Sequence, residues 1–186
     1  MGETSKYRAV ILNLLYKFRG KDIPYNLDIL DIGCGDDPIT PTCAKLDLEK
    51  PYTKCDPRKL TYRGDARYVD QFVMDKFDVV YSSHLLEDFL RNETIKTLCK
   101  WTSLLLDGGI LVLLLPDQQR YIKHCEMIDE LPNEHHSIED FSMEYILGCL
   151  NQIDNLVVLF SKEFFENNDY NFLIVAKKMI DNASSL

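Results

Sequence analysis

The sequence lacks a hydrophobic run long enough to cross a bilayer. Its longest apolar stretch, GGILVLLLP, covers only 108–116, whereas a membrane-spanning helix needs about 20 such residues. The first ten residues, MGETSKYRAV, have neither the basic start nor the apolar stretch of a signal peptide. We therefore expect a cytoplasmic protein without a membrane span.

Positive charge is also scarce. The chain has 21 lysines and arginines against 30 aspartates and glutamates, a formal net charge of −9. A protein that holds a nucleic-acid backbone is usually basic on at least one face. The sequence also has no Asn/Asp-Pro-Pro-aromatic run of the kind found in enzymes that methylate exocyclic base nitrogens. Nucleic acid is therefore an unlikely partner.

Paired cysteine motifs are absent. None of the six cysteines forms a C-x-x-C pair, and in a chain without an export signal we expect reduced thiols. His124, Cys125, His135 and His136 offer metal-binding atoms, but their spacing matches no standard zinc arrangement. No metal site is predicted from the sequence.

What the sequence does contain is an alternation of strand and helix patterns. Apolar residues at steps of three and four over 5–18 predict an N-terminal helix, assigned to 1–20. Near-continuous apolar runs at 27–32, 77–83 and 110–116 are typical of a parallel sheet covered on both faces. Further strands are expected at 43–48, 60–65, 155–160 and 171–177, and further helices at about 92–106, 118–130 and 138–150.

Two connections are unusual. About ten residues, including Pro38 and Pro41, separate Gly35 from the second strand, so a full crossover helix does not fit there. The last two strands are joined by a short polar segment, which predicts a hairpin with one antiparallel strand. No linker divides the chain, so we expect one domain over 1–186 with a flexible tail at 178–186.

A glycine turn follows the first strand in LDILDIGCGDDP. The strand ends at Asp31, and Gly33 and Gly35 allow either a close approach to a ligand or simply a sharp turn with positive φ. Asp36 and Asp37 come next. A carboxylate about 4 Å from a phosphate charge costs roughly 4 kcal/mol at an effective dielectric near 20. NAD and ATP are therefore disfavoured, whereas S-adenosylmethionine has no phosphate and carries a cationic sulfonium.

Acidic residues also end the next two strands. Asp47 is placed to accept hydrogen bonds from ribose hydroxyls, or else is a solvated strand end. Asp65 is placed to accept a hydrogen bond from an adenine amino group beside the backbone N–H of Ala66, or else is an ordinary turn residue. Their shared position at successive strand ends favours a binding site.

The motifs LDIGCGDDP, KLDL, GDA, FDVVYSSHLLEDF and LLLDGGILVLLLPD resemble class I S-adenosylmethionine-dependent methyltransferases over about 27–177. FDVVYSSHLLE is similar to a small-molecule methyltransferase branch in which His-x-Leu-Glu-His is usual; here the second histidine is Asp88. The resemblance implies an α/β, Rossmann-like seven-stranded mixed sheet of order 3-2-1-4-5-7-6, with strand 7 antiparallel and helices on both faces. It also implies cofactor contacts from Asp31, Gly33, Cys34, Gly35, Asp47, Leu48, Asp65, Ala66 and Ser82, with Ser82 at the amino group.

Methyl transfer needs alignment of the acceptor, and a base only when the acceptor is protonated. His84, just after the fourth strand, is the best-placed base; Glu87 lies three residues on, and Asp117 ends the fifth strand. Each is alternatively structural, because loop histidines and helix-capping acids are common. The His135–His136 loop is placed to close over the crevice. Tyr121, Phe141 and Tyr145 either line an acceptor pocket or fill the core.

The sequence thus predicts a methyltransferase acting on a small molecule or a glycan. One alternative is a cofactor-binding partner protein that does not catalyse, favoured by Asp88 and the short first crossover. A nicotinamide oxidoreductase is a third interpretation, weakened by Asp36 and Asp37.

Overall fold

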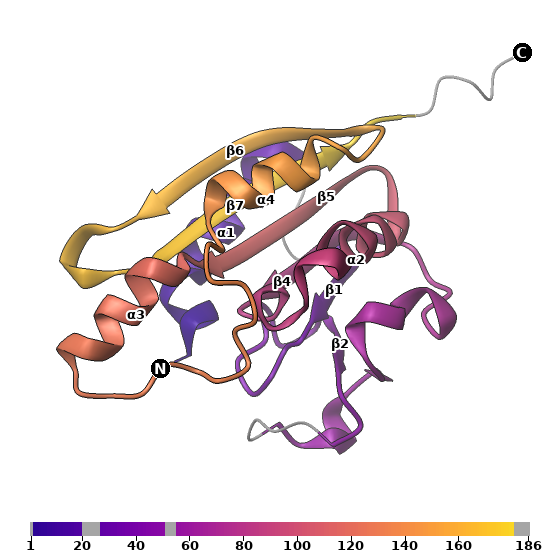
Figure 1. Ribbon diagram of the computed structural model, residues 1–186. Coiled ribbons are helices and arrows are strands. Elements are labelled where there is room, and N and C mark those ends of the chain that lie inside the picture. Colours follow the sequence, from indigo (N-terminus) through magenta and orange to yellow (C-terminus); the bar gives the residue numbers. More distant parts are fainter. Residues whose placement is uncertain (1, 20–26, 51–54, 181–186) are drawn as a thin grey trace, which may run out of the picture.

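The computed structural model describes residues 2–19, 27–50 and 55–180, which form a seven-stranded sheet with helices on both faces (Figure 1). The strand order is β3-β2-β1-β4-β5-β7-β6. The first five strands in this order are parallel to one another, and β7 is antiparallel to both of its neighbours, β5 and β6. The predicted order and antiparallel seventh strand are confirmed. The strands are β1 Ile29–Ile32, β2 Ala44–Asp47, β3 Tyr62–Arg63, β4 Phe77–Ser83, β5 Leu105–Pro116, β6 Leu156–Phe164 and β7 Asn171–Lys178.

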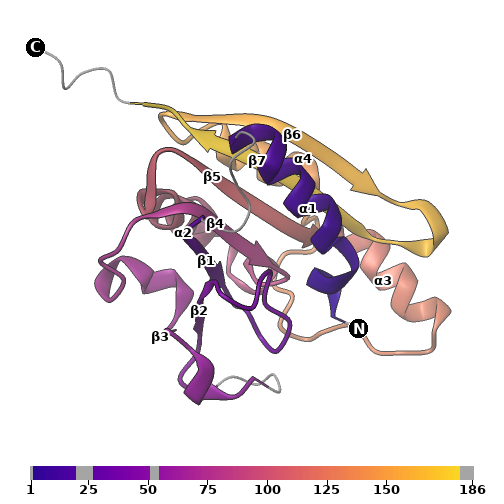
Figure 2. The ribbon, with the colours of Figure 1, turned by 180° about the vertical axis from the view of Figure 1, so that it is seen from behind.

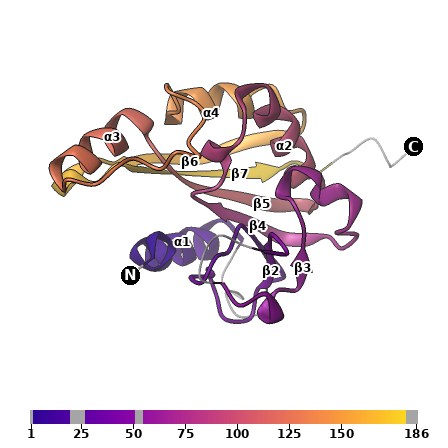
Figure 3. The same cartoon turned by 60° about the horizontal axis from the view of Figure 1, so that its bottom comes forward.

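The helices cover the two faces unequally. α1 crosses one face, and α2 and α4 pack on the other, as Figures 2 and 3 show. Tyr7, Ile11 and Leu15 of α1 are buried against β1, β4, β5 and β7; burial of such a side chain contributes about 1.5–3 kcal/mol. The helices are α1 Glu3–Arg19, α2 Arg91–Ser103, α3 Gln118–Met127 and α4 Met143–Leu150, with short 3-10 turns η1 Pro57–Lys59, η2 Ala66–Gln71, η3 Leu86–Asp88 and η4 Glu166–Asn168.

Several predicted boundaries move. α2 ends at Ser103 rather than near 106, because Leu105 already pairs with Phe77 and begins β5. α4 begins at Met143 rather than 138, where the Ser142 hydroxyl accepts a hydrogen bond from a backbone N–H and caps the helix. β6 continues to Phe164, so the hairpin to β7 is shorter than predicted.

The first crossover contains no helix, as predicted. Residues 33–43 form a series of turns, yet β1 and β2 pair in parallel, with Leu30 opposite Ala44. The segment is held from inside: the Asp31 carboxylate accepts a hydrogen bond from the Ile39 N–H at 2.7 Å. Ile39 is fully buried in the core between α1 and the sheet. This buried side chain and buried hydrogen bond replace the packing that a crossover helix would supply.

Within the part of the chain that the structure describes, no helix combines the length and the apolar character needed to cross a bilayer. The six cysteines are free thiols. Residues 1 and 20 of the predicted N-terminal helix and 181–186 of the predicted tail lie outside the described residues.

Candidate active site

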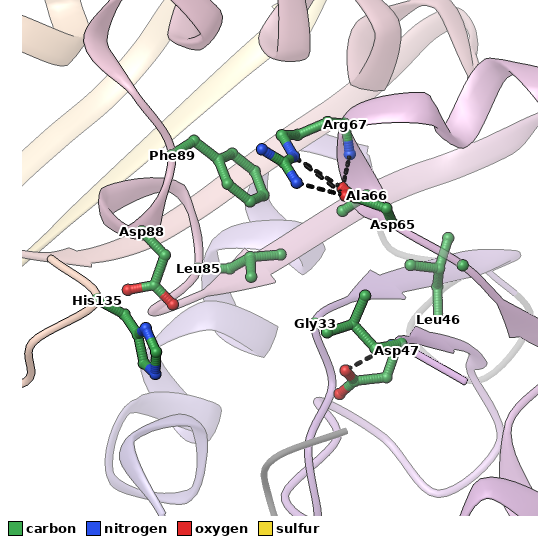
Figure 4. Close-up of a pocket in the computed structure, with 12 residues that line it drawn as sticks. Gly33, Leu46, Asp47, Asp65, Ala66, Arg67, Leu85, Asp88, Phe89 and His135 are labelled. Atoms are coloured by element: carbon green, nitrogen blue, oxygen red, sulfur yellow. Dashed lines mark hydrogen bonds and ion pairs between the residues drawn. The ribbon is translucent and has the colours of Figure 1, made fainter. Parts of the chain in front are cut away.

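A pocket of about 200 Å³ opens at the carboxyl ends of β1, β2 and β3, beside the turn that follows β4 (Figure 4). Typical small-molecule pockets have volumes of roughly 300–1,000 Å³, so a larger ligand would rest partly outside this one. Sheets of this kind bind ligands at this edge. The pocket is lined by Gly33, Leu46, Asp47, Leu48, Gly64, Asp65, Ala66, Arg67, Leu85, Asp88, Phe89 and His135.

The glycine turn needs both of its glycines. Gly33 has φ +72°, and a Cβ there would lie 2.7 Å from the Leu85 side chain. Gly35 has φ +51°, and its N–H donates to the Asp47 carboxylate at 2.9 Å. The sharp turn with positive φ is present at both glycines, and at Gly33 a side chain is also excluded by Leu85; the close approach to a ligand stays a prediction.

Asp47 combines a structural bond with free acceptor capacity. One carboxylate oxygen accepts from Gly35 N–H, and the other accepts from Leu48 N–H at 2.8 Å. A carboxylate has about four lone-pair sites, so two remain for a ligand's hydroxyl groups. The glycine turn thus fixes the orientation of the acid that ends β2.

Asp65 is compensated by a cation. Its carboxylate accepts hydrogen bonds from the guanidinium of Arg67, at 2.6 Å for the shortest, and this bonding lowers the pKa of Asp65. Arg67 also lies 3.4 Å from Glu93 of α2. Asp65 is therefore ionised at neutral pH, but its charge is shared with Arg67 on the same wall of the pocket.

α2 holds this end of the pocket in place. The Trp101 indole N–H donates to the Ala66 carbonyl at 2.9 Å, and Lys100 donates to the Arg67 carbonyl at 2.9 Å. Trp101 is fully buried. The indole bond fixes the backbone beside Asp65, and no sequence motif indicates it.

Four predicted contact residues lie behind the wall rather than in the lining. The Ser82 hydroxyl is fully buried and donates to the Ile32 carbonyl at 2.9 Å. Asp31 is also buried, and burial raises its pKa to about 7. Together with Cys34 and Gly35, these residues support the turn, while Gly33, Asp47, Leu48, Asp65 and Ala66 line the pocket.

The expectation that Asp36 and Asp37 face the ligand is wrong. The Asp37 carboxylate accepts hydrogen bonds from Ser5 N–H at 2.7 Å and from Arg8 at 2.6 Å, so it faces α1. Asp36 is exposed and does not line the pocket. The carboxylates at the pocket are instead Asp47, Asp65 and Asp88.

His84 marks an abrupt turn at the end of β4. It has φ +50°, a left-handed conformation that is uncommon outside glycine and is often associated with functional sites. Its Nε2–H donates to the Asn171 Oδ1 at 2.7 Å; the Asn171 amide nitrogen is engaged by Glu3 and Asp169, which fixes Oδ1 as the acceptor. The proton of neutral His84 therefore sits on Nε2, and Nδ1 is left as a base.

Glu87 lies between two histidines. Its Oε1 is 3.6 Å from Nδ1 of His84 and 3.8 Å from Nε2 of His136, and its side chain is 1% exposed. Among the described residues, neither Glu87 oxygen has a hydrogen-bond partner. Burial raises the pKa of Glu87 and lowers the pKa of both histidines, that of His136 to about 4. Burial therefore disfavours the charged form of all three groups.

None of the three catalytic candidates lines the pocket itself. His84 and Glu87 are the chain neighbours of Leu85 and Asp88, which do line it. Asp117 lies elsewhere, where it caps α3 by accepting from the Arg120 N–H at 3.1 Å.

The loop predicted to close over the crevice does reach it. His135 lines the pocket, and Figure 4 shows its side chain beside that of Asp88. The next residues fasten the loop, because Ser137 N–H donates to the Glu87 carbonyl at 3.1 Å. Phe141 is buried in the core, Tyr145 packs against that core, and neither lines the pocket, whereas Tyr121 stacks near His136.

The residues that the sequence did not identify are mostly apolar or cationic. They include Leu46, Leu85 and Phe89, whose side chains look in sequence like ordinary core residues. Arg67 had a usable signal, since an arginine two residues after a strand-end acid can pair with it. Gly64 also lines the pocket, in the same turn as Asp65.

Solved structures with the same fold include methyltransferases of low sequence identity. An S-adenosylmethionine-dependent methyltransferase from Clostridium acetobutylicum has TM-score 0.65 and 14% identity, and the match covers 96% of this chain and 93% of that one. The plantazolicin methyltransferase BamL, in complex with a triazolic desmethylPZN analog and SAH, has TM-score 0.65, 15% identity and coverages of 95% and 86%. The N-methyltransferase NodS from Bradyrhizobium japonicum, in complex with S-adenosyl-L-homocysteine, has TM-score 0.63, 14% identity and coverages of 95% and 88%.

No curated protein matches the chain significantly in sequence. A family model described as a methyltransferase domain, however, matches residues 4–160, which is most of the chain. The chain therefore belongs to the methyltransferase-domain family, and the resemblance predicted from its motifs is confirmed.

Proposed function

We propose that this chain transfers a methyl group from S-adenosylmethionine to a small-molecule acceptor. One observation carries the proposal: Asp47 and Asp65, which follow neighbouring parallel strands, line one pocket together with the turn after β4. That arrangement suits an adenosine group, with hydroxyls toward Asp47 and a base toward Asp65 and Ala66. Family membership supports the same chemistry.

The residues present fit the adenosine part of the donor. Asp47 retains lone pairs for ribose hydroxyls, and exposed Leu48 with buried Leu46 offers an apolar surface. The donor supplies a methyl group already activated by a cationic sulfur. Asp88 lies across the pocket from Asp65 (Figure 4), and its carboxylate favours a positive charge on that side.

The acceptor end of the proposal rests on the His84 cluster. Nδ1 of His84 carries a lone pair that faces the Glu87 carboxyl at 3.6 Å, and the ring is fixed by Asn171. Such a group removes a proton from a hydroxyl acceptor at neutral pH. Burial raises the pKa of Glu87 and so disfavours a fixed negative charge beside His84. We propose His84 as the base, Glu87 as its neighbour, and Asp117 as a helix cap.

Calorimetry with S-adenosylhomocysteine, a chelator and a reductant tests the donor site. Asp47→Asn weakens binding at least tenfold in this proposal, because an amide replaces an acceptor that the ribose needs. Asp36→Asn is the matched control, since it removes the same charge from an exposed neighbour outside the pocket. An equal loss of affinity for S-adenosylhomocysteine in both variants contradicts the assignment, and so does tighter binding of NAD than of S-adenosylhomocysteine.

A cofactor-binding protein without catalysis is the second candidate. The observation that favours it is that His84, Glu87 and Asp117 all lie outside the pocket lining. An assay of methyl transfer from labelled S-adenosylmethionine to a panel of small-molecule and glycan acceptors distinguishes the two candidates. A methyltransferase forms a labelled product, whereas a non-catalytic protein binds S-adenosylmethionine and forms none. The free thiols favour a reducing compartment, and we propose a cytoplasmic location.

A further inference from the structure

A cluster of soft and hard metal-binding atoms lies at the end of β2. Cys34 Sγ, Cys55 Sγ and a carboxylate oxygen of Asp47 all lie within 4.8 Å of one another. The three residues come from the glycine turn, from β2 and from the segment before η1. Their spacing within residues 34–55 matches no standard metal-binding motif, so the sequence alone gives no sign of the site. We propose that they form a binding site for a thiophilic divalent cation such as Zn²⁺.

The donor set suits zinc. Zn²⁺ takes thiolate sulfur at about 2.3 Å and carboxylate oxygen at about 2.0–2.2 Å in a tetrahedral arrangement. Such a tetrahedron places its ligand atoms roughly 3.5–3.8 Å apart. The present separations of at most 4.8 Å need to shorten by only about 1 Å. Three protein ligands leave a fourth position for water, as in open zinc sites.

Two of the ligands are already oriented by backbone hydrogen bonds. Asp47 accepts from Gly35 N–H at 2.9 Å and from Leu48 N–H at 2.8 Å, which leaves lone pairs for a cation. The Cys34 N–H donates to the Leu46 carbonyl at 3.2 Å, which ties its backbone to β2. Metal-binding carboxylates are characteristically held by such outer hydrogen bonds.

The local charge favours a cation. Burial raises the pKa of both thiols, and the carboxylates that raise them further include Asp31 and Asp47 for Cys34 and Asp36 and Asp47 for Cys55. A bound cation is attracted by these carboxylates, and a cation stabilises the thiolate form of a cysteine ligand.

Asp47 belongs to both this site and the proposed donor site. If the proposed function holds, a cation on Asp47 withdraws the acceptor that the ribose requires. Metal occupancy and donor binding then exclude each other. The metal site itself does not depend on the proposed function.

Cobalt titration in the presence of a non-thiol reductant tests the site. We expect one Co²⁺ per chain with a thiolate-to-cobalt charge-transfer absorption. Cys55→Ser reduces the band and weakens binding at least tenfold, while Cys99→Ser, which removes an exposed cysteine on α2, changes neither. Thermal unfolding of Cys55→Ser without metal checks that the variant is folded; Cys55 is only half-buried, so we expect a melting temperature close to that of the parent.

The outcomes separate the two proposals. Absence of the charge-transfer band in the parent, or equal Co²⁺ affinity in folded Cys55→Ser, overturns the metal site. Saturating S-adenosylhomocysteine should weaken Co²⁺ binding at least tenfold, and unchanged affinity with the compound bound overturns the shared use of Asp47. The donor calorimetry contains a chelator, so its failure leaves the metal result standing.

Discussion

Replacement of Asp31 by Asn should flatten the dependence of stability on pH. The Asp31 carboxyl is buried at the end of β1, where burial raises its pKa to about 7 and its bond from Ile39 N–H only partly offsets that cost. In the unfolded chain an aspartate has a pKa near 3.9. The stability that the protonated form contributes is therefore full below about pH 4 and is lost as the pH rises to about 7.

The size of the effect follows from the two pKa values. Each pH unit between them costs about 1.4 kcal/mol, so ionisation of Asp31 removes about 4 kcal/mol in all. Between pH 5 and pH 7 the parent should lose about 2–3 kcal/mol relative to Asp31→Asn. An asparagine amide oxygen can still accept the Ile39 bond, so the variant should fold.

Urea unfolding of both proteins at pH 5, 6 and 7 measures this difference directly. Glu87 and the other titratable groups are common to both chains, so their contributions cancel in the comparison. A difference in unfolding free energy that stays constant within about 0.5 kcal/mol refutes the reasoning, because it means that Asp31 ionises as it does in water.

Three further substitutions test the site. In His84→Asn, asparagine tolerates the left-handed backbone. This variant should keep its affinity for S-adenosylhomocysteine within about twofold but turn over a hydroxyl acceptor about 10²–10⁴-fold more slowly. In the parent, the acidic limb of the pH–rate profile should lie below the usual histidine pKa near 6.5. Gly33→Ala should cost at least about 1–2 kcal/mol in urea unfolding, because φ is +72° and the new methyl group meets Leu85; unchanged stability contradicts the close approach. Trp101→Phe removes the indole N–H that bonds to the Ala66 carbonyl. It should lower the free energy of unfolding by about 1–3 kcal/mol and weaken the binding of S-adenosylhomocysteine. A loss of stability without a loss of affinity shows that the bond does not shape the pocket.

Local sequence patterns predicted the strands correctly, because each pattern depends only on residues close together in the chain. An apolar run such as 77–83 can only be buried on both faces, and it forms β4 with the predicted boundaries. Helix ends were predicted less well, since they depend on tertiary pairing: Leu105 joins β5 because Phe77 lies opposite it. The missing crossover helix followed from chain length and two prolines alone.

Some features of the site could likewise be predicted from the sequence, and others depend on the tertiary structure. The sequence by itself determined that Gly33, Asp47 and Asp65 meet at one edge of the sheet, because residues that follow parallel strands share that edge. Only the tertiary structure decided which charges face the pocket. Asp37 turns away because Arg8 of a distant helix pairs with it, whereas the ion pair of Asp65 with Arg67 is local in the chain.

The same holds for the two clusters that no motif reveals. His136 approaches Glu87 because a loop distant in sequence folds onto the end of β4, and Cys55 approaches Cys34 because the segments before and after β2 meet. Periodicity and spacing record the secondary structure of a segment and the edge of the sheet at which it ends. They do not record which side chain of one loop meets which side chain of another, because that contact is set by packing across the whole sheet.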